Sequence, residues 1–296
     1  MVQFKIPKSN LIDPLGVGDR VMGVIKKISQ KPLKKQKLGL ALGAGGLWGI
    51  VHIGVLKVLE EKDIQIDYIA GTSIGAIIGA IYSLNPDTKE IEKKVLSLTK
   101  KDLINFFDLT LPRFSLISGN NIKKFIYEIV GNKSFSDTKI PLKIIATDLE
   151  SGEEVILSEG KLIDAIMASI SIPGIFPPVK YKNSLLVDGA LVNATPVNII
   201  KDMGADVVLG VDLNTVIDED FEKPNLFQVL IRSYEILKKH SALSNINLDD
   251  EKILIIRPNI KKLGSFNFYD IKKFVKEGER IARQVLPKIN MLIGEQ

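Results

Sequence analysis

The sequence contains no cysteine in its 296 residues and only two histidines, His52 and His240. The absence of cysteine excludes disulfide bonds, thiolate catalysis and cysteine-based zinc sites. Two histidines are too few for a histidine-rich metal site, so the sequence predicts no metal centre. No segment has the charge-free length that a membrane-spanning helix needs, and the first residues lack the long apolar core of a signal peptide. We therefore expect a cytoplasmic protein.

The rest of the composition is that of an ordinary globular protein, with 45% apolar and 25% charged residues. This length is enough for one large α/β domain with a substantial core. The net charge of +5 is modest and permits contact with anionic lipid without demanding it. The basic residues are spread along the chain rather than clustered with aromatic residues, which argues against nucleic-acid binding.

The chain divides into a basic extension, residues 1–37, and a predicted domain, residues 38–296. The extension mixes lysines with apolar residues, as segments on anionic membranes do. Pro32 interrupts any continuous amphipathic helix there, which favours a solvated extension and leaves peripheral membrane contact as the alternative. The domain alternates strand and helix patterns, which predicts an α/β fold with a largely parallel sheet.

A glycine-rich turn opens the domain. The apolar run Leu38–Leu42 predicts a buried strand, the turn Gly43–Gly46 follows, and a helical pattern runs from about Gly49 to Lys62. The turn matches neither the dinucleotide-binding pattern nor the P-loop. Backbone N–H groups at the start of a helix have no intrahelical acceptor, so this turn could hold an oxyanion.

A G-x-S-x-G motif follows in a second strand–turn–helix unit. Ile66–Ala70 predicts the strand, Gly71-Thr72-Ser73-Ile74-Gly75 is the turn, and Ala76–Ser83 continues as a helix. This order is that of a nucleophile elbow, a strained turn that lifts the serine hydroxyl clear of the sheet. Gly71 and Gly75 let the neighbouring chain pass without Cβ clashes. The motif alone is weak, but the two turns in succession are a much stronger signal.

An aspartate further along the chain is the third candidate. Leu185–Val187 predicts a short strand that ends in Asp188-Gly189-Ala190. An aspartate at the carboxyl end of a strand is well placed for a site in an open α/β sheet. An aspartate before glycine is also common in turns, and on the local residues alone this is the favoured interpretation.

The remaining segments predict helices and a hairpin around these motifs. The expected elements are helices over 88–107 and 120–131, a loop Leu111–Asn121, a hairpin around Gly152, a helix Lys161–Ser171, a proline-stiffened connection Ile172–Val179, and one helix or a pair over 224–247. The apolar side chains of the loop Leu111–Asn121 either form part of an acyl-binding mouth or only anchor the loop to the domain.

The three motifs together resemble the patatin-like phospholipase family, in particular its bacterial and archaeal branch of predicted acylesterases. The block GLALGAGGLWGIVHIGVLKVLEE is similar to the family's oxyanion block, and GTSIGAIIGA to its serine elbow. AIMASISIPGIFPPV and LLVDGALVNATPV are similar to its approach to the D-G-[GA] aspartate. The resemblance covers about residues 38–215, and residues 216–296 add a C-terminal strand and helices.

The resemblance implies a three-layer sandwich with a central, mostly parallel sheet between helices, and hydrolysis of acyl lipids or small esters through an acyl-enzyme. Ser73 matches the nucleophile and Asp188 the general base of a Ser–Asp dyad. The backbone oxyanion donors match Gly45 and Gly46, and the supporting glycines are Gly49, Gly71, Gly75 and Gly189. No metal or cofactor is implied. Trp48 stands where the family usually has arginine or lysine, and Ala44 where it usually has glycine.

Two alternatives stay open. The order Ser73, Asp188, His240 is that of a Ser–His–Asp hydrolase, although His240 lies in a helical pattern and a triad histidine usually lies on a loop. The other alternative is a catalytically silent, lipid-binding or regulatory protein with the same fold, against which the presence of Ser73 and Asp188 argues. These residues specify neither the particular ester nor an oligomeric state.

Overall fold

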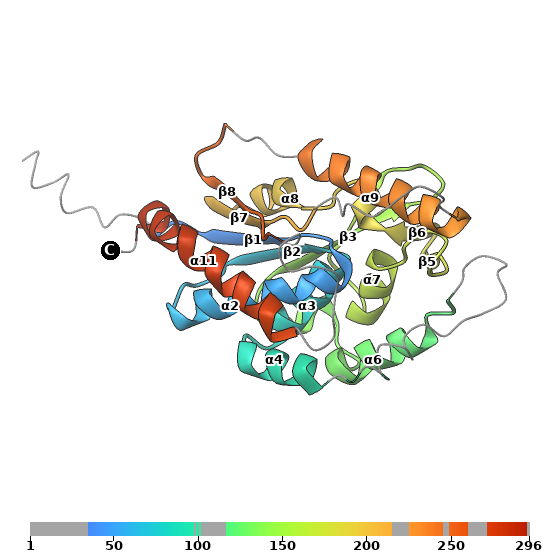
Figure 1. Cartoon of the computed structure of the whole chain (residues 1–296), viewed down its shortest axis with the longest axis horizontal. Coiled ribbons are helices and arrows are strands. Elements are labelled where there is room, and N and C mark those ends of the chain that lie inside the picture. The colour runs from blue at the N-terminus through green and yellow to red at the C-terminus, as the bar shows by residue number, and fades with distance from the viewer. Residues whose placement is uncertain are drawn as a thin grey trace, which may run out of the picture. The chain divides into compact units, whose positions relative to one another are not determined.

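A single mixed β-sheet runs through the middle of the described chain (Figure 1). The computed structural model describes residues 35–97, 99, 101, 117–214, 225–244, 249–259 and 271–294. In these residues the strand order is β5-β6-β3-β2-β1-β7-β8, with β4 also paired to β3. The strands are β1 Leu38–Leu42, β2 Tyr68–Thr72, β3 Leu142–Asp148, β4 Glu154–Leu157, β5 Val179–Tyr181, β6 Ser184–Asp188, β7 Val207–Val211 and β8 Ile253–Ile256.

The sheet is parallel on one side and antiparallel on the other. Strands β3, β2, β1, β7 and β8 run parallel to one another. Strands β4 and β6 pair antiparallel with β3, and β5 pairs antiparallel with β6. The parallel strands are covered on both faces, which explains why β1 and β7 are continuous apolar runs.

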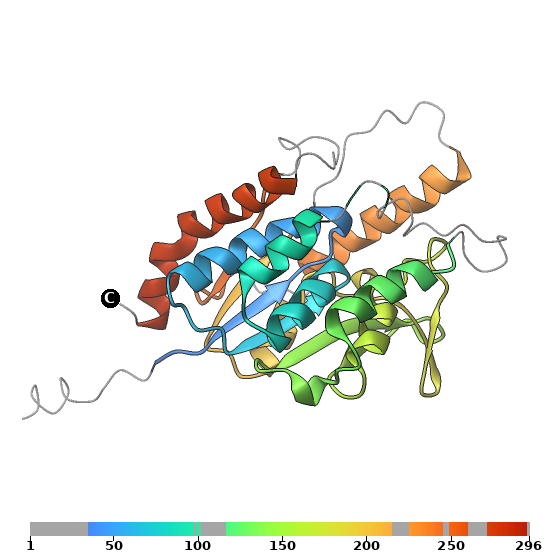
Figure 2. The same ribbon diagram turned by 90° about the horizontal axis from the view of Figure 1, so that it is seen from below.

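Helices cover both faces of the sheet. In Figure 1, α8 and α9 lie above the sheet, and α2, α3, α4, α6 and α7 lie below it. Figure 2 shows the lower layer from beneath, where α11 lies beside α2. The helices are α2 Val51–Glu61, α3 Ile74–Leu84, α4 Thr88–Ser97, α6 Asn120–Val130, α7 Leu162–Ser169, α8 Val197–Asp202, α9 Leu226–Ser244 and α11 Ile271–Ile293, with 3-10 turns η1 Gly46–Ile50, η2 Phe135–Asp137 and η3 Gly189–Leu191.

Side chains that alternate along the strands build two separate cores. Leu38, Leu40 and Leu42 of β1 pack into the larger core, on the side of α2, α3 and α11. Ala41, between them, packs into the smaller core with Ile200 of α8. Successive side chains of a strand point to opposite faces, so this division is what a sheet between two helical layers requires. The predicted three-layer α/β fold is confirmed.

The structure differs from the predicted elements in three places. β2 spans Tyr68–Thr72 rather than the expected Ile66–Ala70, so it begins two residues later and includes the first glycine of the elbow. The three-residue strand β5 was not expected, since it begins inside the proline-stiffened connection. The helix expected over 88–107 ends at Ser97 in the described chain. Most of the extension 1–37 and of the loop Leu111–Asn121 lies outside the described residues, so both expectations stay predictions.

Of the helices in the described ranges, none combines the length and apolarity that crossing a bilayer requires.

The contact between α2 and α11 yields a first prediction. A Cβ on Gly278 of α11 would overlap the carbonyl oxygen of Val51, because the two backbones touch there. A backbone oxygen cannot rotate away, so we expect Gly278→Ala to lower the free energy of unfolding by about 1–3 kcal/mol. Denaturant unfolding measures the loss, with Lys276→Ala at an exposed position of the same helix as the control. Equal stability of the two variants would contradict the close contact.

Candidate active site

Ser73 occupies a strained turn between β2 and α3. Its φ is 56° and its ψ −120°, a region that residues other than glycine rarely adopt. A Cβ on Gly75 would overlap the Leu42 carbonyl oxygen, and one on Gly71 would overlap the carbonyl oxygen of Gly75. Only glycine fits at these two positions, so the local geometry is that of the elbow that the motif predicts.

Ser169, at the end of α7, holds this turn in place. The backbone N–H of Ser73 donates to Ser169 Oγ at 2.8 Å, and Ser169 Oγ donates to the Ile145 carbonyl of β3 at 2.6 Å. Both hydrogen bonds are buried, so the strained residue is fastened to the neighbouring strand. The sequence predicts only that Ser169 lies in a helix, since a serine near a helix end carries no specific signal.

Asp188 reaches Ser73 from the opposite direction. β6 runs antiparallel to β3 and ends with Asp188 paired to Ala146, next to the position where Ile145 pairs with Thr72 of β2. The ends of β2 and β6 therefore meet across β3. Ser73 Oγ donates to Asp188 Oδ2 at 2.7 Å, and the Asp188 side chain is fully buried. The strand was predicted, but its antiparallel direction was not.

The Asp188 carboxylate is more basic than an ordinary aspartate. Burial raises its pKa from 3.8 to about 6, against hydrogen bonds from the Ala190 N–H and the Ser73 hydroxyl that lower it. The Ala190 N–H lies 2.8 Å from Oδ1. A carboxylate with this pKa is ionised at neutral pH and close to the pH at which a general base is most effective.

The glycine-rich turn leaves two backbone donors free among the described residues. The N–H groups of Gly43 and Ala44 bond to the carbonyls of Val211 and Ala194, at 3.0 and 2.8 Å. The N–H groups of Gly45 and Gly46 meet no protein acceptor in the described chain.

The turn also packs against the two other predicted motifs. A Cβ on Gly49 of η1 would overlap the side chain of Ile74, the residue after Ser73, so η1 and the elbow are in contact. A Cβ on Gly189, after Asp188, would overlap the Ile145 carbonyl oxygen of β3, and Ala190 packs with Ala44 of the turn. Each of the predicted site residues therefore lies at one end of the sheet.

The two histidines lie in different surroundings. His52 is buried, and its Nε2 donates to the Gly43 carbonyl at 2.8 Å, so it supports the glycine-rich turn. Burial lowers the pKa of His52 to about 4, so the ring is neutral at pH 7. His240 is exposed on α9, and within the described chain its ring contacts neither Ser73 nor Asp188. This geometry does not support a Ser–His–Asp triad.

Trp48, at the position where a cation was expected by resemblance, packs as an aromatic residue. Its ring stacks on Phe274 of α11 with centroids 5.9 Å apart and an angle of 27° between the planes. Trp48 therefore contributes to packing between η1 and α11. Within the described ranges, no group of three or more metal-ligating side chains gathers.

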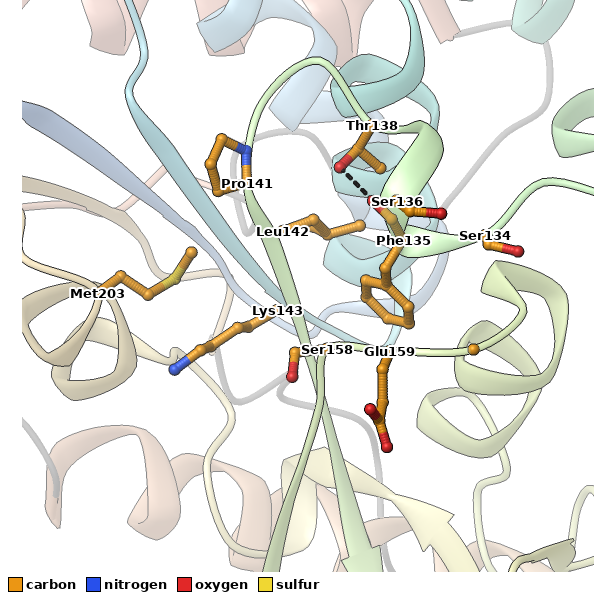
Figure 3. A pocket seen from close by; sticks show the side chains of 11 residues that line it. Ser134, Phe135, Ser136, Thr138, Pro141, Leu142, Lys143, Ser158, Glu159 and Met203 are labelled. Atoms are coloured by element: carbon orange, nitrogen blue, oxygen red, sulfur yellow. Dashed lines mark hydrogen bonds between the residues drawn. The ribbon is translucent and has the colours of Figure 1, made fainter.

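A cavity of about 420 Å³ lies at the other end of β3 (Figure 3). Pro141 and Leu142, where β3 begins, line it together with Phe135 and Met203. Ser73 and Asp188 lie where β2 and β6 end, so this cavity is separate from the candidate site.

Comparison with known proteins identifies the family. The model of the patatin-like phospholipases matches residues 40–200, which is more than half of the chain. The chain belongs to the patatin-like phospholipase family. This match includes the glycine-rich turn, the elbow of Ser73 and Asp188.

Curated relatives share the same region. Lysophospholipase NTE1 of Coccidioides immitis is 34% identical over 283 residues, which are 86% of this chain and 18% of that protein. Neuropathy target esterase sws of Drosophila melanogaster is 32% identical over 193 residues, 64% of this chain and 14% of that protein. The chain thus spans less than a fifth of the length of these relatives. Among solved structures, VipD from Legionella pneumophila has a TM-score of 0.49 and 14% identity, and the match covers 86% of this chain and 67% of that one.

The hydrogen bonds of Ser169 yield a second prediction. Ser169→Ala leaves the Ser73 N–H and the Ile145 carbonyl without this partner, which we expect to cost about 1–3 kcal/mol of unfolding free energy. Ser171→Ala is the matched control, because its buried hydroxyl donates only to the Met167 carbonyl at 2.7 Å. Thermal unfolding compares the two, and equal losses would show that Ser169 has no special part in holding the elbow.

The pKa of Asp188 yields a third prediction. Because the folded-state pKa lies above 3.8, the folded state binds more protons between pH 3.8 and about 6. The stability that this group contributes is therefore present below pH 3.8 and lost as the pH rises through about 6. We expect Asp188→Asn to be more stable than the parent at pH 8 by about 2–3 kcal/mol, with a smaller gain at pH 4.5. Denaturant unfolding at both pH values measures the difference, and an equal gain at both would contradict it.

Proposed function

We propose that this chain is a serine hydrolase that cleaves carboxylic esters of acyl lipids, of the phospholipase A, lysophospholipase or acylesterase type. The observation that carries the proposal is the 2.7 Å hydrogen bond between Ser73 Oγ, on a strained elbow, and the buried carboxylate of Asp188. Membership of the patatin-like phospholipase family and the names of the curated relatives support an ester of a lipid as the substrate.

In the proposed reaction, Asp188 takes the proton of Ser73 as Oγ attacks the ester carbonyl. The carbonyl oxygen becomes an oxyanion, which the N–H groups of Gly45 and Gly46 stabilise. The C–O bond to the alcohol breaks, the alcohol leaves with the proton from Asp188, and the acyl group stays on Ser73. Asp188 then takes a proton from water, the hydroxide attacks the acyl-enzyme, and Ser73 Oγ leaves and regains its proton.

Contact with a membrane surface is part of the proposal, since acyl lipids reside there. Exposed apolar side chains recur at helical spacing along α9. The set and the exposed fractions are Leu226 75%, Val229 43%, Leu230 50%, Ile236 47% and Leu237 53%. A helix with such a stripe can lie in the interface of a bilayer, and the net charge of +5 favours anionic lipid.

Labelling by a fluorophosphonate probe tests the nucleophile. We expect one covalent adduct on the parent protein and none on Ser73→Ala, read from the intact mass, because only an activated serine reacts. His240→Ala is the control and is expected to label as the parent does, since its ring lies on the exposed side of α9. No adduct on the parent, with and without anionic phospholipid vesicles, would contradict the proposal and favour a catalytically silent protein. A panel of lysophospholipid, phospholipid and simple carboxylic esters then identifies the substrate.

A further inference from the structure

The end of β7 lies between the glycine-rich turn and β8. β7 pairs with β1 on one side and with β8 on the other (Figure 1). On the β1 side, the Gly43 N–H donates to the Val211 carbonyl at 3.0 Å. On the β8 side, the Asp212 N–H donates to the Ile256 carbonyl, also at 3.0 Å. Backbone pairing therefore continues to the point where the turn begins, and the residues that follow β7 emerge beside the candidate oxyanion donors.

Leu213, which follows Asp212, packs directly against Gly45 of the turn. A Cβ on Gly45 would overlap the Leu213 side chain, whereas a Cβ on Gly46 would have no atom within 4 Å. Leu213 is buried and belongs to the larger core. The turn is therefore supported by a core side chain at Gly45 and is open at Gly46.

Gly45 is the residue at which such support has the largest effect on the two donors. Its Cα joins the planar peptide groups that carry the Gly45 and Gly46 N–H, so its φ and ψ set the angle between these groups. Glycine has no Cβ that would restrict φ and ψ, so its neighbours must restrict them. A side chain in a close-packed core can do so, because the interior leaves little free volume into which it could move.

The carboxylate of Asp212 holds Leu213 in this place. Asp212 is only 3% exposed. Its Oδ1 accepts from the backbone N–H of Asn214 at 2.9 Å and from the side-chain amide of Asn214 at 2.6 Å. Its Oδ2 accepts from Nε of Arg257, the residue after β8, at 2.7 Å. Leu213 lies between the two residues that the carboxylate joins, and the ion pair ties this short loop to β8.

We propose that the ion pair of Asp212 and Arg257 positions the candidate oxyanion donors through Leu213. The guanidinium binds the carboxylate, the carboxylate fixes the backbone on both sides of Leu213, and Leu213 holds Gly45. All three act through Gly45, so they are positioning residues. An oxyanion hole is effective only when its donors already point to the place where charge develops. The catalytic consequence rests on the proposed function, whereas the order of the two N–H groups can be measured without turnover.

The same ion pair also ties β8 to the rest of the sheet, and a second ion pair on that strand provides the matched control. Lys201 of α8 pairs with Asp250, shortly before β8 begins, at 2.8 Å between Nζ and Oδ2. Lys201→Gln removes an ion pair that also joins the β8 segment to the domain, but at the end of the strand away from Gly45. Arg257→Gln and Leu213→Ala are therefore compared with Lys201→Gln.

The first test measures the motion of the two donors. In protein labelled with nitrogen-15 at glycine, the order parameter of each backbone N–H reports its motion on the picosecond-to-nanosecond timescale. For Gly45 and Gly46 we expect values near about 0.85 in the parent, below about 0.6 in Leu213→Ala and between these in Arg257→Gln. Lys201→Gln is expected to match the parent. Unchanged values in Leu213→Ala or Arg257→Gln, or an equal fall in Lys201→Gln, overturn the proposal.

The second test measures stabilisation of an oxyanion by binding. An acyl trifluoromethyl ketone forms a bond from its carbonyl carbon to Ser73 Oγ, the serine proton passes to Asp188, and the carbonyl oxygen becomes an oxyanion. The matching alcohol has no carbonyl and forms no oxyanion. Trp48, the single tryptophan of the chain, lies in η1 directly after the donors, so its fluorescence follows binding of both ligands.

We expect Leu213→Ala to weaken binding of the ketone by about 10- to 100-fold and of the alcohol by less than about 2-fold, since loss of a whole oxyanion donor costs about 100- to 1000-fold in kcat. Arg257→Gln is expected to show the same selectivity with a smaller loss, and Lys201→Gln to bind both ligands as the parent does. An equal loss for ketone and alcohol reports a generally damaged site and overturns the proposal.

The two tests also separate this inference from the proposed function. If Leu213→Ala does not fold, Arg257→Gln decides, because the Arg257 side chain is 49% exposed and its replacement leaves the core intact. If the order parameters fall as expected but the parent forms no fluorophosphonate adduct, the proposed hydrolase activity fails while the positioning of the two N–H groups stands.

Discussion

The hydrogen bond between Ser73 Oγ and Asp188 Oδ2 is the contact on which the arrangement of the candidate site depends. A carboxylate without water around it is costly unless donors surround it. Here the Ser73 hydroxyl and the Ala190 N–H supply them, yet the pKa of Asp188 still rises to about 6. The protein therefore keeps a partly compensated charge in its interior, and the two packed cores on either side of the sheet offset that cost.

The backbone around the serine adds a second cost, because Ser73 has a positive φ without being glycine. Such a conformation persists only where the surroundings leave no alternative. Gly75 lies against the carbonyl of Leu42, and Ser169 ties the Ser73 N–H to β3. The strain thus lies in a region that is surrounded by fully paired parallel strands, where the chain has little freedom to relax.

The sequence predicted the parts of the site that depend on local chemistry. The elbow of Ser73 could be found because a strained turn restricts its neighbours to glycine within two residues. Asp188 could not be told from a turn aspartate by its own neighbours, and only the order of the three motifs singled it out. Its approach to Ser73 depends on β6 running antiparallel beside β3, which is a property of the whole sheet.

Ser169 illustrates what a sequence pattern could not reach. It is an ordinary helical residue by its neighbours, and it acquires its contacts from segments far away in the chain. The short strand β5 was missed for a related reason: three residues beside prolines have no pattern of their own, and pairing with β6 makes them a strand. Long-range packing thus decided what local propensity left open.

The wide spacing of these segments has a consequence for biosynthesis. Ser73 and Asp188 are separated by 115 positions, and α9 follows later still. A nascent chain therefore carries the elbow long before its carboxylate partner has been made. A copy whose translation stops before residue 188 has the serine without the carboxylate, so it is released without the paired dyad.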